Sequence, residues 1–77
     1  MDEASFISNV TMQFLDDNDS DALTTGTRFR DLESWDSMTG MAIIVMIEDD
    51  YGVKIDDMTF RSFTTIGDLY NFVKANS

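Results

Sequence analysis

Residues 36–55 read DSMTGMAIIVMIEDDYGVKI, and this stretch contains the clearest helix signals in the chain. Asp36 is a favourable N-cap, because its carboxylate can accept hydrogen bonds from the free amides of a first helical turn. Gly52 can adopt the left-handed backbone conformation that ends a helix. The stretch therefore predicts a helix that begins at Asp36-Ser37 and ends at Gly52.

The apolar residues of this helix cover more than one of its faces. Met38, Met41 and Val45 follow one another at spacings of three and four, which is the periodicity of an amphipathic helix. Residues 41–47 are apolar without a break. Inward packing alone does not need so many apolar positions. We therefore expect either a central helix between its neighbours or a helix whose outer side meets a partner.

The two ends of the chain predict two further helices. Residues 2–15 carry apolar side chains at helical spacing, with acidic residues at the start, where they suit the helix dipole. Near the other end, Thr65 and Asp68 form a shortened version of the capping box, and Lys74 suits a last turn. The apolar positions are Phe6, Ile7, Val10, Phe14 and Leu15 in the first helix, and Ile66, Leu69, Tyr70 and Val73 in the last.

The connections between these helices carry weaker signals. Residues 16–27 are rich in Asp, Ser, Asn and Thr, and they predict a loop. Apolar residues scattered from 23 to 35 indicate that this connection folds back over the core. Residues 53–55 predict a short extended piece with two side chains in the core, and residues 57–63 predict a brief helical turn with both phenylalanines inward.

At 77 residues the chain is predicted to be a single domain, 1–77, with an all-α fold: a small bundle of three main helices and a short fourth. A chain of this size buries only about 60% of the surface that it exposes when unfolded, so its core must be economical. We expect seven side chains in that core: Phe6, Phe14, Leu32, Val45, Phe63, Ile66 and Leu69.

The composition excludes several kinds of chemistry. The chain has no cysteine, so it can form neither a disulfide nor a cysteine-based zinc site, and it has no histidine. It therefore lacks the side chains most used as activated nucleophile and general base near neutral pH. Carboxylates on helix surfaces, with no apolar pocket around them, are poor substitutes. We expect a protein that is not an enzyme, with any catalysis supplied by its partners.

Charge and hydropathy limit the partners that the chain can bind. Fifteen acidic residues against five basic ones give a net charge of −10. Nucleic acids and anionic membranes repel such a chain, whereas basic protein surfaces attract it. The longest apolar run, residues 41–47, is too short to span a bilayer, and residues 1–3 lack the positive charge of a signal peptide. We expect a free-standing, monomeric, cytoplasmic protein that binds neither nucleic acid nor membranes.

The acidic segment that starts at Asp17 invites comparison with an EF-hand calcium loop. Counted from Asp17, the sixth position is Ala22, where the loop needs glycine, and the twelfth is Arg28, where it needs glutamate. Both failures fall on residues that the coordination geometry requires. The pattern therefore disfavours a calcium-dependent regulatory protein and predicts no specific metal site, while weak divalent binding by the loop stays open.

Residues 36–55 resemble the acyl carrier protein family in several features at once. That family has an Asp-Ser-Leu or Asp-Ser-Met signature at the start of its second helix, which corresponds to residues 36–38 here. Its helix ends in an acidic cluster, an aromatic residue and a short Val-x-Ile-like strand, as in residues 48–55. Residues 63–69, FTTIGDL, are similar to the start of the family's last helix. The N-terminal helix and the acidic loop fit as well, so the resemblance covers essentially the whole chain.

The resemblance implies that Ser37 carries a prosthetic group. A phosphopantetheinyl transferase would move 4′-phosphopantetheine from coenzyme A onto the Ser37 hydroxyl, at a helix N-terminus that favours negative charge. The arm would supply the thiol that the chain lacks, and the thiol would hold acyl or aminoacyl cargo as a thioester, as in fatty acid or polyketide biosynthesis. Position alone favours the alternative that Ser37 is an ordinary polar N1 or N-cap residue, and the full pattern favours attachment.

Two departures from the family's usual form bear on cargo and partners. The residue before the Asp-Ser pair is commonly glycine and is Trp35 here, which could plug the core or shape the surface that a transferase meets. Many fatty-acid carriers have acidic residues one and two turns into the second helix, where this chain has Thr39 and Ala42. The second departure favours a carrier outside the primary fatty-acid system. The cargo stays open between fatty acyl, polyketide, aminoacyl and D-alanyl groups.

Enzymes that process such a cargo reach the arm across the surface around the second helix. Exposed charges mainly steer the encounter, whereas methionine, which is unbranched and polarizable, suits partners of different shape. We expect Met46 to matter more than Glu48, the alternative being that Met41 and Met46 pack inside the bundle. A helical interaction module without a prosthetic group is the alternative function. The predicted partner surface consists of Asp36, Met38, Met41, Ala42, Met46, Glu48 and Asp49.

Overall fold

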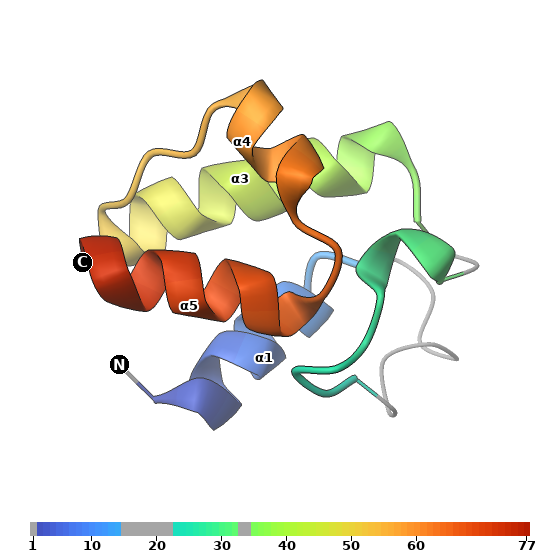
Figure 1. Ribbon diagram of the computed structural model, residues 1–77, viewed down its shortest axis with the longest axis horizontal. Coiled ribbons are helices and arrows are strands. Elements are labelled where there is room, and N and C mark those ends of the chain that lie inside the picture. The colour runs from blue at the N-terminus through green and yellow to red at the C-terminus, as the bar shows by residue number, and fades with distance from the viewer. Residues whose placement is uncertain (1, 15–22, 33–34) are drawn as a thin grey trace.

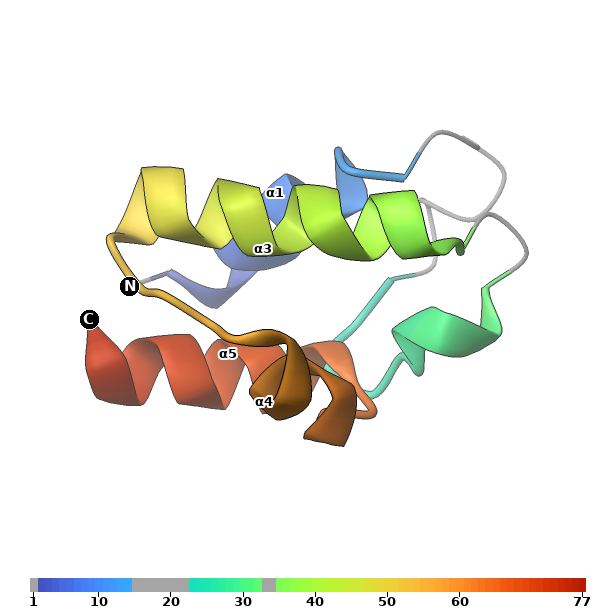
Figure 2. The ribbon, with the colours of Figure 1, turned by 90° about the horizontal axis from the view of Figure 1, so that it is seen from above.

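The computed structural model describes residues 2–14, 23–32 and 35–77. In these residues the elements are α1 (Glu3–Thr11), a 3₁₀ turn η1 (Phe29–Asp31), α3 (Ser37–Tyr51), α4 (Asp57–Ser62) and α5 (Ile66–Asn76). α3 and α5 run in the same direction, while α1 runs opposite to both and contacts both (Figure 1, Figure 2). The described part of the chain is a small all-α bundle with three main helices and a short fourth, which confirms the predicted fold class.

Side chains cap the start of each of these four helices. At α1, α3 and α4 an aspartate accepts a hydrogen bond from the backbone N–H three residues further on. At α5 the capping box is complete: Thr65 accepts from the N–H of Asp68, and the Asp68 carboxylate accepts from the N–H of Thr65. Each cap satisfies amides that have no partner inside the helix. The capping residues are Asp2, Asp36, Asp56 and Thr65.

The end of α3 also lies where the sequence predicted it. Gly52 has a φ of 70°, in the left-handed region, and its N–H donates to the carbonyl of Glu48 at 3.0 Å. A Cβ at this position would meet no atom within 4 Å. Glycine is therefore favoured here by the backbone conformation and not by crowding.

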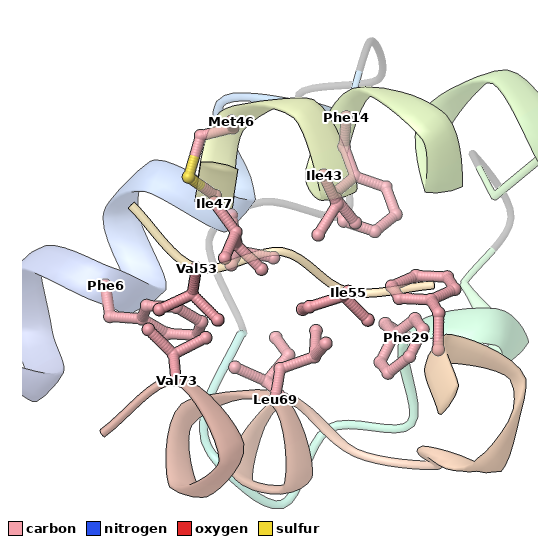
Figure 3. Close-up of a cluster of buried hydrophobic side chains, with 13 residues drawn as sticks. Phe6, Phe14, Phe29, Ile43, Met46, Ile47, Val53, Ile55, Leu69 and Val73 are labelled. Carbon is pink, nitrogen blue, oxygen red and sulfur yellow. The ribbon is translucent and has the colours of Figure 1, made fainter. Parts of the chain in front are cut away.

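The core lies between α1, α3 and α5, and Figure 3 shows its side chains meeting there. Ile43 and Ile47 from α3 face Leu69 and Val73 from α5, with Phe6 from α1 beside them. All five are completely buried. The remaining buried apolar residues are Val10, Phe14, Phe29, Met46, Val53, Ile55, Phe60 and Ile66.

Val45 was predicted to be a core residue, and this prediction is wrong. Its side chain is 50% exposed, and Met38 and Met41 on the same face are 79% and 60% exposed. The buried face of α3 carries Ile43 and Ile47 instead. Spacing of three and four identifies residues that share a helix face, but it does not say which face points inward when both faces are apolar.

The other predicted core residues lie in or against the core. Phe6, Phe14, Ile66 and Leu69 are buried. Leu32 and Phe63 are half-buried and pack against the buried cluster.

α1 is shorter than predicted, since it ends at Thr11 and not near residue 15. The Thr11 hydroxyl donates to the carbonyl of Ile7 at 2.8 Å, and the chain then turns. Phe14 still enters the core after this turn, because it is only 6% exposed. Leu15 lies outside the described residues.

The described part of the long connection folds back over the core, as expected. Phe29 is completely buried, and Leu23 is half-buried against the same cluster. Backbone bonds tie this segment to the start of α5, where the N–H of Gly67 donates to the carbonyl of Thr25 at 2.8 Å. A Cβ on Gly67 would lie 2.9 Å from that carbonyl oxygen, so the close approach requires glycine. Residues 17–22, the first half of the segment compared with a calcium loop, lie outside the described residues.

Hydrogen bonds from the helix caps lower the pKa values of the capping carboxylates. The N–H and then the hydroxyl of Thr39 lower the pKa of Asp36 below its ordinary value of 3.8, and Thr59 acts in the same way on Asp56. Because the folded pKa lies below the unfolded one, this stabilisation is present above pH 3.8 and is lost as the pH falls through the folded pKa.

Acidification below pH 3.8 is therefore expected to lower the melting temperature of the protein. Thermal melts recorded by circular dichroism at several pH values measure this change. The matched control is the double variant Asp36→Asn and Asp56→Asn, because asparagine caps helices about as well but does not titrate. The variant should lose less stability than the wild type over the same pH interval. An equal loss in both proteins would show that the caps do not contribute to the acid response.

Candidate functional site

Ser37 is the first residue of α3, and its side chain is exposed. The N-terminal end of α3 lies on the η1 side of the molecule (Figure 1, Figure 2). The side chain of Asp36, and not that of Ser37, caps this helix. The Ser37 hydroxyl is therefore presented to solvent at a helix N-terminus without serving as the cap.

Asp36 places a negative charge directly before this hydroxyl. One oxygen of its carboxylate accepts hydrogen bonds from the N–H of Thr39 at 2.7 Å and from the Thr39 hydroxyl at 2.9 Å. These two bonds lower the pKa of Asp36, so the carboxylate is ionised at neutral pH. Thr39 is itself buried, which anchors the cap to the inner side of α3.

A cavity of about 210 Å³ opens beside Ser37, between α3, α4 and η1. Ile44, Met41 and Phe60 give it apolar walls, and two arginines also line it. The cavity could shelter part of a flexible group attached to Ser37. Its full lining is Arg30, Trp35, Ser37, Gly40, Met41, Ile44, Asp57, Phe60 and Arg61.

Arg30 holds α4 against η1. Its guanidinium donates to the carbonyl of Phe60 at 2.7 Å and also to the carbonyl of Phe63. These carbonyls lie at the end of α4, and the carbonyl of Phe60 also accepts from the N–H of Phe63 at 3.1 Å. The same guanidinium lies 4.8 Å from the ring centre of Phe29 and 5.3 Å from that of Phe60. Sequence reasoning missed Arg30, since its partners lie about thirty residues further along the chain.

Trp35 plugs the space between the elements around the cavity, which was one of its two predicted roles. Its ring stacks on Phe60 with centroids 6.2 Å apart and an interplanar angle of 20°. It also meets the ring of Phe29 edge-on at 5.5 Å. The side chain is half-buried and packs against the core.

Residues 7–73 match the family model described as a phosphopantetheine attachment site. The chain is 33% identical over 57 residues to the acyl carrier protein of Treponema denticola, a match that covers 74% of this chain and 73% of that protein. The chain belongs to the acyl carrier protein family. It is also 31% identical over 58 residues to the acyl carrier protein of Phytoplasma australiense, covering 75% and 76% of the two chains.

Membership of the acyl carrier protein family establishes the kind of protein. The chain is a carrier and not an enzyme, and its prosthetic group is a covalently attached 4′-phosphopantetheine. The family interacts with phosphopantetheinyl transferases and with acyl-processing enzymes. The residues around the start of α3 fit such a group, because an exposed hydroxyl lies beside a cavity with apolar walls.

The structure places most of the predicted partner surface on the exposed side of α3. Asp36, Met38, Met41, Glu48 and Asp49 are exposed, and Ala42 is half-buried.

Met46 is the exception, because it is only 8% exposed and belongs to the core. The expectation that it lies on the outer surface is wrong, since it shares the inner face of α3 with Ile43 and Ile47. Sequence reasoning did not include Val45 and Asp50 in the partner surface, although both line an open depression of about 450 Å³ along α3.

Among the described residues, no helix is long and apolar enough to cross a membrane.

Proposed function

We propose that Ser37 is the residue to which the 4′-phosphopantetheine arm is attached, and that the arm presents acyl thioesters to partner enzymes. One observation carries this proposal: Ser37 is exposed at the start of α3, while Asp36 performs the capping. The hydroxyl can therefore be modified without loss of the helix start. The residue also lies within the Asp-Ser-Met sequence at 36–38 that resembles the family signature.

The attachment step is a phosphoryl transfer from coenzyme A. The Oγ of Ser37 forms a bond to the phosphorus that bears the pantetheine, and the pyrophosphate bond of coenzyme A breaks. Adenosine 3′,5′-bisphosphate leaves, and the hydroxyl proton passes to a base of the transferase, because this chain has no histidine to accept it. The phosphodiester that results lies at the N-terminus of a 15-residue helix, where the helix dipole favours negative charge.

The outer surface of α3 supports the prediction that this carrier works outside the primary fatty-acid system. The first two turns of α3 expose Met38 and Met41, and Val45 is exposed further along the helix. Acidic residues return only at Glu48, Asp49 and Asp50, near the end of the helix. Partners of this carrier should therefore combine an apolar contact with basic groups placed toward the end of α3, which suits the net charge of −10. An aminoacyl cargo is as compatible with this surface as an acyl cargo.

The test of this function is the mass of the protein after incubation with coenzyme A and a broad-specificity phosphopantetheinyl transferase. We expect the chain to gain the mass of one phosphopantetheine, and peptide mapping should place it on Ser37. A gain on another residue would contradict the proposed attachment site. No gain at all would favour a helical interaction module that carries no prosthetic group.

Of the two methionines expected on the partner surface, only Met41 is exposed, so the expected effect on partner recognition shifts from Met46 to Met41. Met41→Ala should lower the efficiency of acyl transfer with a cognate loading enzyme several-fold and leave the melting temperature unchanged, because Met41 is 60% exposed. Met46→Ala should instead destabilise the fold by about 2–5 kcal/mol, as truncation of a buried methionine does. Transfer kinetics and thermal melts of both variants check this prediction.

The salt dependence of acyl transfer separates the contribution of the apolar contact from the contribution of charge. Glu48→Gln should weaken transfer at low ionic strength, and the effect should shrink as salt is added, because salt screens exposed charges. The Met41→Ala effect should persist at high salt. Normal transfer by Met41→Ala at every salt concentration would exclude this residue from the partner surface.

A further inference from the structure

Positive charge is scarce in this chain, yet it gathers beside the proposed attachment site. Only five residues are basic, against fifteen acidic ones. Two of the five, Arg30 and Arg61, line the same cavity as Ser37. A pair of arginines in an acidic protein attracts negatively charged groups to that place.

Arg30 is already engaged in the fold. Its guanidinium donates to the carbonyls of Phe60 and Phe63 and lies 4.8 Å from the ring centre of Phe29. A move toward a ligand would break the contacts that hold α4 against η1. Of the two arginines, Arg61 is therefore the one that can turn toward a group on Ser37.

Arg61 lies on the face of α4 that borders the start of α3. Asp57 and Arg61 are four residues apart, so they share one face of α4, and both line the cavity with Ser37. Phe60, the residue before Arg61, comes close to α3, because a Cβ on Gly40 would lie 3.4 Å from its Cε2 atom. Gly40 follows Ser37 by three residues, so α4 passes α3 within one turn of the proposed attachment site.

The present partner of Arg61 holds it only weakly. Its Nε lies 2.9 Å from a carboxylate oxygen of Asp57, and the two side chains are 76% and 66% exposed. Exposed ion pairs of this kind contribute little to stability, because water and salt screen them. The guanidinium also has two further nitrogens whose N–H groups can donate to a second acceptor. Arg61 can therefore bind another anion, either together with Asp57 or in its place.

Attachment of the arm would add a negative charge beside one that is already present. Asp36 precedes Ser37, and its carboxylate is ionised at neutral pH. A phosphodiester on the Ser37 Oγ would place a second negative charge at the same helix start, and the two charges repel each other. An arginine offsets this repulsion, because its planar guanidinium can donate two parallel hydrogen bonds to the free oxygens of a phosphate group.

We propose that Arg61 binds the phosphodiester of the arm at Ser37, with its guanidinium donating to the free oxygens of that group. The contact fixes the first bonds of the arm on the α4 side of α3 and leaves the rest of the arm mobile. The inference rests on the proposed attachment at Ser37, and it adds a residue that recognises the attached group. Arg61 acts at the anchor of the arm, at the opposite end from the thiol.

The experiment compares the intact protein without the arm (apo) and with it (holo), each confirmed by intact mass, in the wild type and in Arg61→Gln. A contact that exists only in the folded holo protein stabilises the holo form and not the apo form. The difference in melting temperature, holo minus apo, should therefore be lower in Arg61→Gln by about 2–5 °C. A purely structural role of Arg61 would lower both melting temperatures equally, and an unchanged difference would overturn the inference.

Lys54→Gln is the matched control, because it removes one positive charge elsewhere. Lys54 is exposed and follows the far end of α3, a 15-residue helix that spans about 22 Å. This variant should keep the wild-type difference between holo and apo. An equal decrease in Lys54→Gln and Arg61→Gln would assign the effect to net charge and overturn the contact. Arg61→Lys keeps the charge without the planar fork, so its difference should lie between those of the wild type and Arg61→Gln.

Phosphorus-31 NMR observes the phosphodiester directly. Arg61→Gln should move the phosphorus resonance of the folded holo protein toward its position in urea-unfolded protein, and Lys54→Gln should leave it in place. The same phosphorus shift in the wild type and Arg61→Gln would overturn the inference. Loading is measured first by mass, so absence of the arm from Ser37 would overturn the attachment and this inference together. Complete loading at Ser37 without these differences would overturn only the role of Arg61.

Discussion

The variant Ser37→Ala is expected to gain no phosphopantetheine under conditions in which the wild type is fully modified. The substitution removes the one atom that can form the phosphodiester at this position, so the loss should be complete and not partial. Far-ultraviolet circular dichroism should be unchanged, because Asp36 supplies the cap of α3 and alanine is a good helix former. Intact mass spectrometry after reaction with coenzyme A and transferase measures the outcome.

Ser8→Ala provides the matched control, since Ser8 is another exposed serine in a helix. It should be modified as completely as the wild type. Modification that persists in Ser37→Ala would mean that another hydroxyl accepts the arm. A variant that is unmodified but also unfolded would show that Ser37 has a structural role that its exposed position does not predict.

Leu69→Ala is expected to lower the free energy of unfolding by about 2–5 kcal/mol, the usual range for truncating a fully buried leucine. Leu69 exposes no surface and lies between α5 and the side chains of α3 in the centre of the core (Figure 3). A domain of this kind has only about 5–15 kcal/mol of stability in total. The variant should therefore unfold at much lower urea concentration, or be partly unfolded without denaturant.

Val45→Ala is the control for this prediction, because sequence reasoning placed both residues in the core. Val45 is half exposed on the outer face of α3, so its truncation should change stability by no more than about 0.5 kcal/mol. Urea titrations of both variants measure the difference. Equal destabilisation by the two substitutions would mean that the outer face of α3 is packed in solution.

Structural features that depend on neighbouring residues in the sequence were predicted well. The start of α3 at Asp36 and its end at Gly52 both lie where predicted, and so does the capping box of Thr65 and Asp68. Each of these features depends on hydrogen bonds or backbone angles within four residues. The Asp-Ser-Met segment belongs to the same class, so the sequence also located Ser37 at an exposed helix start, although attachment there stays a prediction.

Features that depend on distant parts of the chain were not predicted. Met46 was expected on the surface and Val45 in the core, and the structure exchanges them. The two residues are adjacent on a helix whose faces are both apolar, so hydropathy cannot decide between them. Arg30 gave no signal either, because the carbonyls it binds belong to α4.

The sequence by itself determined that this chain forms capped helices, that it has no cysteine to act as a nucleophile, and that it carries a serine in a family signature at a helix start. Only the tertiary structure decided which face of α3 is buried, because the packing of α1 and α5 against one side leaves the other to solvent. It also decided the role of Trp35. An indole next to an Asp-Ser pair is a plug only because Gly40, Phe29 and Phe60 converge on it in space.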